Sequence, residues 1–196
     1  MRQNLKNSSL VSFFILILAT WSHAGTLDEI QRRYMQYNDF IVVFTQDTYQ
    51  ALVDKRIHFT GKVFYKRDVG VRMDVYEPQR QMIILKDQTV LIHLPDENTT
   101  TCQELPKEIA SQNILGFFSG LNSIDEDYTI EDTQDELILH PKGGTGFISI
   151  QTDESDHISR ILLKDATGNN STIVLSDYQF NTGMQEDIFF LNQKPE

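Results

Sequence analysis

Residues 56–78 show the clearest alternation of apolar and polar side chains in the sequence. Successive side chains of an extended strand point to opposite faces, so a period of two indicates one apolar and one polar face. The pattern predicts two antiparallel strands joined by a short turn at residues 68–70. The apolar face of the first strand is expected to carry Ile57, Phe59, Val63 and Tyr65, with Gly61 between them.

Arg67 departs from this pattern. Counting on by twos from Tyr65 reaches Arg67, so a guanidinium that is always charged falls on the apolar face at the end of the strand. We therefore single out Arg67 as a candidate functional residue. Arg72, on the second strand, has the opposite phase and stands near Asp74. We expect it on the outer face, with its aliphatic stem packed on the sheet.

Further segments with strand character follow one another at short intervals. They lie at residues 39–49, 81–86, 89–94, 98–104, 128–131, 136–141, 147–152, 158–164 and 171–180. Turn residues separate most of them, including a two-residue hairpin candidate at Asp87-Gln88. About eleven strands with mostly short connections predict an antiparallel sheet that curls into a barrel or a half-barrel.

Two segments have helical rather than strand character. Leu27, Ile30 and Tyr34 recur at three- and four-residue steps, which predicts an amphipathic helix at residues 27–36. Residues 107–121 are too apolar for an ordinary surface helix, and two interpretations stay open: a helix packed on the core, or an apolar lid. The predicted fold is mainly β with a helical lid (α+β). The apolar side chains of the insert are Ile114, Leu115, Phe117, Phe118 and Leu121.

Residues 1–24 have the pattern of a secretory signal peptide. Arg2 and Lys6 precede an apolar run, and Ser22 and Ala24 are small residues of the kind that signal peptidase recognises. The run is about ten residues long, against the roughly 20 that cross a bilayer, which disfavours the alternative of an uncleaved anchor. Residues 25–196 are then expected to form a single exported domain.

The chain is acidic, with a net charge of −11 that becomes −13 once Arg2 and Lys6 are removed. This charge argues against nucleic acids and anionic lipid headgroups as partners. It favours solubility, or a basic protein partner. Cys102 is the only cysteine, so no intramolecular disulfide can form, and we interpret it as a small strand residue.

The sequence contains no motif that requires an enzyme, a metal or a cofactor. Its histidines beyond residue 24 are scattered singly, without metal-ligand spacing. Neither a Gly-x-Ser-x-Gly elbow nor a phosphate-binding loop is present. The acidic residues 125–127 fit a solvated loop better than a cation site. A hydrolase is the weakest of the open alternatives, and a curled sheet with a large concave face favours a binding function instead.

Several short motifs follow one another in order along nearly all of residues 25–196. They are Phe44-Thr45-Gln46, Tyr65-Lys66-Arg67 after Gly61, Val71-Arg72-Met73 before Glu77-Pro78, Leu91-Ile92-His93-Leu94-Pro95, and the closing Tyr178-Gln179-Phe180 and Ile188-Phe189-Phe190-Leu191. In this order and spacing they resemble the periplasmic outer-membrane lipoprotein carrier family, LolA.

The resemblance implies an unclosed antiparallel β-barrel, with an N-terminal helix and a helical insert covering an apolar cavity. It implies a monomer in the periplasm of a Gram-negative bacterium, which takes acylated lipoproteins from an ATP-driven inner-membrane release complex and passes them to an outer-membrane receptor. The expected cavity and lid residues are Leu27, Ile30, Tyr34, Phe44, Phe59, Val63, Tyr65, Ile114, Leu115, Phe117, Phe118 and Leu121.

Two finer assignments also rest on the resemblance. In the family, an arginine after the glycine-containing strand binds the backbone of the lid helix and holds the empty carrier closed, and Arg67 is the matching residue. The family often has proline next, whereas Asp68 follows here and could weaken this latch. Val71 and Met73 stand where the family has a large apolar residue and a tryptophan, which predicts a partner-docking surface that differs from the family's.

Three alternatives to lipoprotein transport stay open at this point. The nearest is a related envelope carrier, on the same fold, for a glycolipid or another acylated molecule. A second is a sensor domain that binds lipoproteins to control a stress response, but it needs a second domain. The third, an outer-membrane receptor, is disfavoured because the chain has no lipid-anchor cysteine near the predicted cleavage site.

Overall fold

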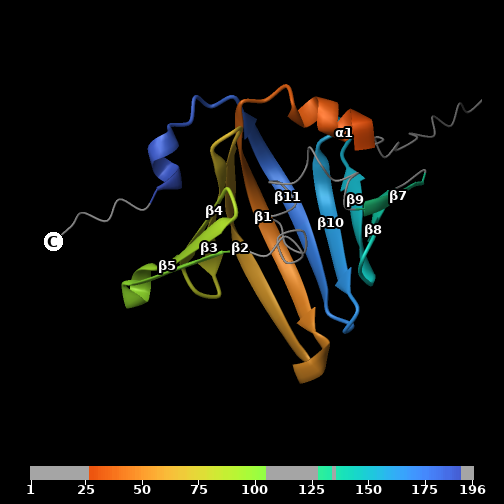
Figure 1. The fold of residues 1–196 in the computed structure, drawn as a ribbon, viewed down its shortest axis with the longest axis horizontal. Helices are drawn as coiled ribbons and strands as arrows, with labels where there is room; N and C mark the ends of the chain where they lie inside the picture. The colour runs from red at the N-terminus through yellow and green to blue at the C-terminus, as the bar shows by residue number, and fades with distance from the viewer. Residues whose placement is uncertain (1–26, 105–127, 134–135, 191–196) are drawn as a thin grey trace, which may run out of the picture.

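The computed structural model describes residues 27–104, 128–133 and 136–190, and Figure 1 shows their fold. The predicted signal peptide and the predicted insert at residues 107–121 lie outside these ranges. The α-helix of the described residues is α1 (Leu27–Tyr34). The strands are β1 (Asp39–Gln50), β2 (Lys55–Lys66), β3 (Gly70–Glu77), β4 (Gln81–Lys86), β5 (Thr89–Leu94), β6 (Thr99–Glu104), β7 (Tyr128–Asp132), β8 (Leu137–Pro141), β9 (Gly146–Thr152), β10 (Ile158–Asp165) and β11 (Asn170–Phe180).

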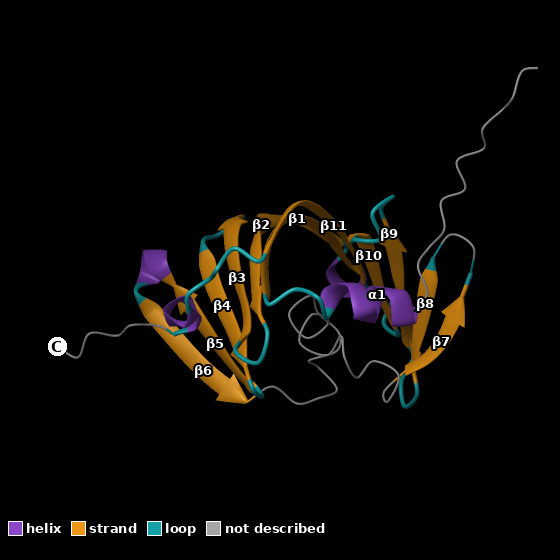
Figure 2. Cartoon of the chain, turned by 90° about the horizontal axis from the view of Figure 1, so that it is seen from above, coloured by secondary structure: helices purple, strands orange, loops and turns teal. Residues whose placement is uncertain are grey.

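These strands form one eleven-stranded sheet in the order β6-β5-β4-β3-β2-β1-β11-β10-β9-β8-β7. All neighbours are antiparallel, and β1 joins the two runs of hairpins by pairing with both β2 and β11. β6 and β7 stand at the two ends of the order and do not pair with each other, so the sheet is unclosed. Figure 2 shows it as an arch, with α1 on the concave side. The predicted unclosed antiparallel sheet is confirmed.

The strand boundaries agree with the alternation in the sequence, and β4 and β5 have the predicted limits. The helix is shorter than predicted and ends at Tyr34 rather than at residue 36. Its last turn tightens, because the N–H groups of Gln36 and Tyr37 bond to carbonyls three residues earlier.

Side-chain alternation gives the sheet an apolar cluster on each face. On the concave face, α1 and the strands share one continuous core, in which Phe44 and Val63 are fully buried. On the convex face, a smaller cluster forms around Ile84. The alternation of β2 places Tyr65 in the concave core and its neighbour Phe64 in the convex cluster.

A C-terminal segment that the sequence analysis did not predict covers the convex cluster. We call residues 181–190 the C-terminal strap. Lys66 Nζ donates a hydrogen bond to the backbone oxygen of Met184 at 2.6 Å, and Arg72 Nη1 donates to that of Ile188 at 2.9 Å. Arg72 is also paired with both carboxylate oxygens of Asp74, at 2.7 and 2.9 Å. Its contacts with Ile188 and with the ring of Phe64 confirm its predicted place on the outer face.

Asp39 holds the other end of the strap. Its carboxylate is buried and accepts hydrogen bonds from the backbone N–H and the hydroxyl of Thr182, at 2.6 and 2.7 Å, and from the N–H of Met184 at 3.2 Å. Burial alone would raise the pKa of Asp39, but these hydrogen bonds outweigh burial and lower it. The charged form is therefore the one that the folded protein stabilises.

Replacing Asp39 with asparagine is expected to destabilise the protein by about 2 kcal/mol at neutral pH, because charged hydrogen bonds of this kind are lost. A carboxyl whose pKa is lowered on folding stabilises the protein above the pKa of the unfolded chain, and this stability is lost as the pH falls through the folded-state pKa. The variant should therefore lose less stability than the wild type between neutral and acid pH. Urea unfolding at several pH values would measure this. Asp87→Asn, an exposed turn residue, is the control, and an Asp39→Asn protein with wild-type stability and acid response would contradict the account.

Candidate functional site

The concave apolar face is the first feature of the candidate site. Ile83, Ile92 and Leu163 line it as partly buried side chains packed against the concave core. Of the predicted cavity residues, Leu27, Ile30, Tyr34, Phe44 and Val63 are buried in that core, and Phe59 and Tyr65 are partly buried against it. The remaining predicted residues, Ile114, Leu115, Phe117, Phe118 and Leu121, lie outside the described residues.

Arg67 fastens the end of α1 to the end of β2. Its Nη2 donates hydrogen bonds to the backbone oxygens of Met35 and Tyr37, the latter at 2.6 Å. Its backbone N–H donates to the backbone oxygen of Asn38 at 2.9 Å. Met35 directly follows the last residue of α1, where carbonyls lack intrahelical partners and carry partial negative charge, so a cation is well placed there. Arg67 thus links the sheet to the segment that follows α1, and we call these hydrogen bonds to Met35, Tyr37 and Asn38 the clasp of Arg67.

Asp68 leaves the guanidinium of Arg67 free to make these contacts. No ion pair among the described residues joins Arg67 to Asp68. Asp68 has a φ of 59°, in the left-handed region, which aspartate tolerates and proline cannot adopt. The backbone conformation at position 68 therefore excludes proline, which the family that the sequence resembles often has there.

A second set of contacts fastens α1 to the other half of the sheet. The Tyr34 hydroxyl donates to the Tyr178 hydroxyl at 3.0 Å, and the latter donates to the backbone oxygen of Ile158 at 2.8 Å. The N–H of Ile158 closes the ring by donating to the Tyr34 hydroxyl at 3.1 Å. Burial raises the pKa of both tyrosines, so both hydroxyls stay protonated and satisfied.

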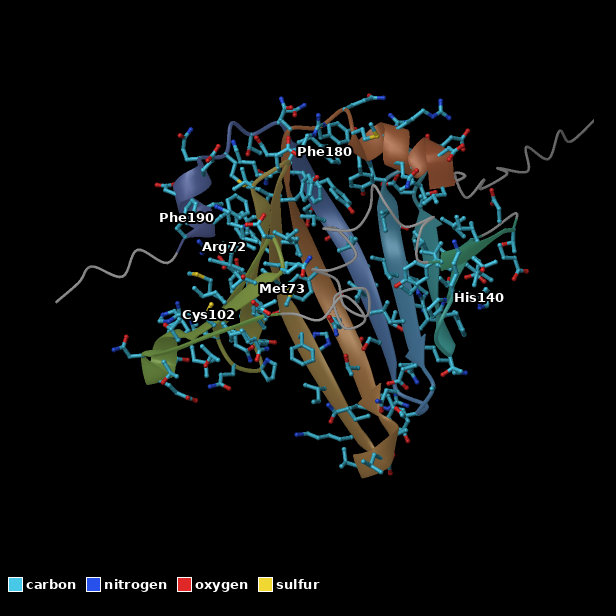
Figure 3. The ribbon with its side chains drawn as sticks, in the orientation of Figure 1. Arg72, Met73, Cys102, His140, Phe180 and Phe190 are labelled. Carbon is cyan, nitrogen blue, oxygen red and sulfur yellow. The ribbon has the colours of Figure 1, made fainter. Side chains whose placement is uncertain are left out.

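Polar contacts flank this ring of hydrogen bonds. Arg33 pairs with Asp156 at 2.8 Å, and the Tyr37 hydroxyl lies 3.2 Å from Nε2 of His157. The His157 ring also lies 4.7 Å from that of Phe180, at the end of β11 that Figure 3 shows near α1. Burial lowers the pKa of His157, which favours a neutral ring at this contact. α1 is thus attached to β2 at one end and to the β9–β10 turn and β11 along its length.

Val71 and Met73 lie on the concave side of β3. Val71 is fully buried in the concave core and Met73 is partly buried against it. Figure 3 labels Met73 near the middle of the ribbon and Arg72, the preceding residue of β3, above it. Partner docking through these two residues stays a prediction, and it requires access to the concave face.

Sequence reasoning missed Asp156 and Tyr178 as contacts of α1, and His157 as a contact of Tyr37, which follows the helix. In the sequence, His157 is only one of several singly placed histidines. Tyr178 and Phe180 belong to the closing aromatic motif, so their shared phase was the signal that could have placed them on the concave face. Within the described residues, no group of three His, Cys, Asp or Glu side chains could hold a metal ion. No described helix has the length and apolar character needed to cross a bilayer.

An arched sheet that presents an apolar face to a fastened helix defines a class of mainly β folds suited to hold apolar ligands. The family model described as "Outer membrane lipoprotein carrier protein LolA" matches residues 36–192. An outer-membrane lipoprotein carrier protein of Actinobacillus succinogenes is 27% identical over 143 residues, covering 72% of this chain and 68% of that protein. Another outer-membrane lipoprotein carrier protein, from Dechloromonas aromatica, is 21% identical over 196 residues, covering 96% of this chain and 94% of that protein.

Solved structures share the same fold. A LolA superfamily protein from Nitrosomonas europaea has a TM-score of 0.52 at 16% identity, covering 86% of this chain and 99% of that one. An uncharacterized conserved protein from Thermus thermophilus has a TM-score of 0.54 at 10% identity, covering 85% of this chain and 94% of that one. The chain belongs to the LolA family of outer-membrane lipoprotein carrier proteins. This is a family of non-enzymatic carriers of the Gram-negative periplasm.

Proposed function

We propose that the protein is a periplasmic carrier that shields the acyl chains of lipoproteins and shuttles them from the inner to the outer membrane. In this proposal the chain is exported by residues 1–24 and cleaved near Ala24. The observation that carries the proposal is the clasp of Arg67 on the end of α1, beside a concave apolar face. Family membership supports the same function.

The acyl chains are proposed to lie against the concave core, beneath α1 and the insert at residues 107–121. Each methylene group removed from water contributes about 0.8 kcal/mol, so the chains are strongly held against release into water. A bilayer offers them the same gain, and the free-energy difference between carrier and membrane is therefore small. Loading moves α1 and breaks its contacts with the sheet, and unloading restores them. The free energy of these contacts therefore determines whether the cargo favours the carrier or the membrane.

The proposed partners follow from this cycle. An ATP-driven inner-membrane complex supplies the free energy that loads the carrier, and an outer-membrane receptor accepts the cargo. Both contacts are transient and the carrier acts as a monomer. Val71 and Met73 are the proposed docking positions, and they become accessible only when α1 and the insert move away from the concave face.

Native mass spectrometry of the protein purified gently from the periplasm tests the cargo. We expect adducts with the mass of a di- or triacylated protein or peptide. The same lipoprotein produced without its acyl chains is the control and should not bind. An adduct with the mass of a glycolipid would favour the alternative carrier. Absence of any lipid adduct, together with failure to keep an added acylated lipoprotein in solution, would contradict both.

A further inference from the structure

An apolar apex stands at the end of the sheet opposite α1. It is formed by the short 3₁₀ turn η1 (Ala51–Val53) at the tip of the β1–β2 hairpin, which Figure 1 shows as the lowest point of the ribbon. The side chain of Leu52 is 96% exposed and that of Val53 is 62% exposed. Single exposed aliphatic side chains are ordinary, but two adjacent ones at the tip of a long hairpin are a surface for another molecule to contact.

Hydrogen bonds fix the backbone conformation of the apex. The backbone N–H of Ala51 donates to Oδ1 of Asn169 in the neighbouring β10–β11 turn, at 2.9 Å. The Tyr49 hydroxyl donates to Oδ1 of Asp54 at 3.0 Å, and the N–H of Asp54 closes the turn on the Ala51 oxygen at 3.4 Å. These contacts hold Leu52 outward and leave its side chain in water.

The residues around the apex are those found at the boundary of a bilayer. Lys55 and Arg56 follow directly and are exposed, and the guanidinium of Arg56 lies 5.1 Å from the centroid of the Tyr49 ring. Cationic side chains with long stems, and tyrosines, are suited to the headgroup level, with their apolar parts directed inward. The chain as a whole is acidic, but at the apex Lys55 and Arg56 outnumber Asp54, so an anionic surface favours approach by this end.

The size of the apex favours a bilayer over a protein. A stable protein interface buries about 800 Å² on each partner, far more than two aliphatic side chains with charged neighbours can supply. A bilayer requires no complementary shape, and it accepts aliphatic side chains below a charged rim.

We propose that Leu52 and Val53 insert into the surface of a phospholipid bilayer, with Tyr49, Lys55 and Arg56 at the headgroup level. The contact is weak and reversible, and it holds the protein at a membrane with α1 pointing away from the lipid. It uses a surface separate from the concave face, so it stands whether or not the cargo is a lipoprotein.

A tryptophan in place of Leu52 reports on this contact directly. The sequence has a single tryptophan, Trp21, within the predicted signal peptide, and the wild-type protein measured in parallel corrects for it. On addition of vesicles of phosphatidylethanolamine and phosphatidylglycerol, we expect the emission of Leu52→Trp to shift to shorter wavelength. Val174 is an aliphatic side chain of β11 that is 45% exposed. The emission of a Val174→Trp variant should not shift when the same vesicles are added.

Co-sedimentation with the same vesicles measures the contribution of the native side chains. The double variant Leu52→Ser with Val53→Ser should reduce the vesicle-bound fraction at least roughly tenfold, because most of the inserted apolar surface is removed. Val174→Ser should leave it unchanged, and circular dichroism should show all variants folded. Equal sedimentation of the double variant and the wild type would overturn the proposal. So would a fluorescence shift seen only with vesicles that carry a membrane protein, which would assign the apex to a protein partner.

Discussion

Replacing Arg67 with leucine is expected to leave the protein folded and loaded but to shift the transfer equilibrium of its cargo toward the carrier by roughly 100-fold. The guanidinium donates two hydrogen bonds to the backbone oxygens of Met35 and Tyr37, and leucine donates none. A hydrogen bond to a charged group contributes about 1.5–3 kcal/mol. Losing about 3 kcal/mol from the closed, empty state shifts the balance toward the loaded state by roughly 100-fold.

The measurement is the fraction of a labelled lipoprotein that has passed from the carrier to receptor-bearing vesicles at equilibrium. Arg80→Leu is the matched control, because Arg80 is an exposed arginine in the turn between β3 and β4. It should transfer cargo to the same extent as the wild type. If Arg67→Leu also does so, while binding cargo normally, the contact with α1 is structural and the proposed latch is wrong.

Replacing Gly61 with alanine is expected to destabilise the protein by about 3 kcal/mol. A Cβ atom at this position would lie 2.0 Å from the backbone oxygen of Asp74 and 2.7 Å from the ring of Phe44. The pairing of β2 with β3 shifts register between Thr60 and Gly61, and the Asp74 carbonyl comes close to Gly61 beside that shift. A backbone oxygen cannot rotate away as a side chain can, so the two strands themselves must move apart.

Urea unfolding gives the free energy directly, provided that the slope with denaturant is unchanged. Gly143→Ala is the matched control, since a Cβ there meets nothing within 4 Å. It should change the free energy of unfolding by less than about 0.5 kcal/mol, as surface substitutions usually do. Equal effects at the two glycines would contradict the close approach of β2 and β3.

The sheet could be predicted because the alternation of apolar and polar residues within each strand shows which side chains share a face. The alternation of Phe59, Val63 and Tyr65 requires no knowledge of the partner strands, and it places Arg67 on the concave side by simple counting. The β1–β11 pairing that joins the two runs of hairpins is different. It depends on residues more than a hundred positions apart, such as Phe44 and Leu175, and no local pattern specifies it.

The contacts of α1 could be predicted only in part. The resemblance pointed to Arg67, and its guanidinium does bind backbone beyond the end of α1. The ring of Tyr34, Tyr178 and Ile158 was not predicted, because each member has an ordinary apolar or strand role in its own segment. The C-terminal strap was missed for a related reason. It has no period of two or of 3.6, and its place follows from Asp39 and Arg72, far away in the sequence.

Among the described strands, β6 and β7 end the sheet without pairing with each other, and this has a mechanical consequence. A cylinder of strands has a fixed circumference, so a change of bore would require hydrogen bonds to break. An arch can flatten or tighten through small changes of twist at each of its strand pairs, while every ladder bond remains made. Such an arch can adjust its span to apolar ligands of different width with the same set of side chains, in addition to the proposed movement of α1.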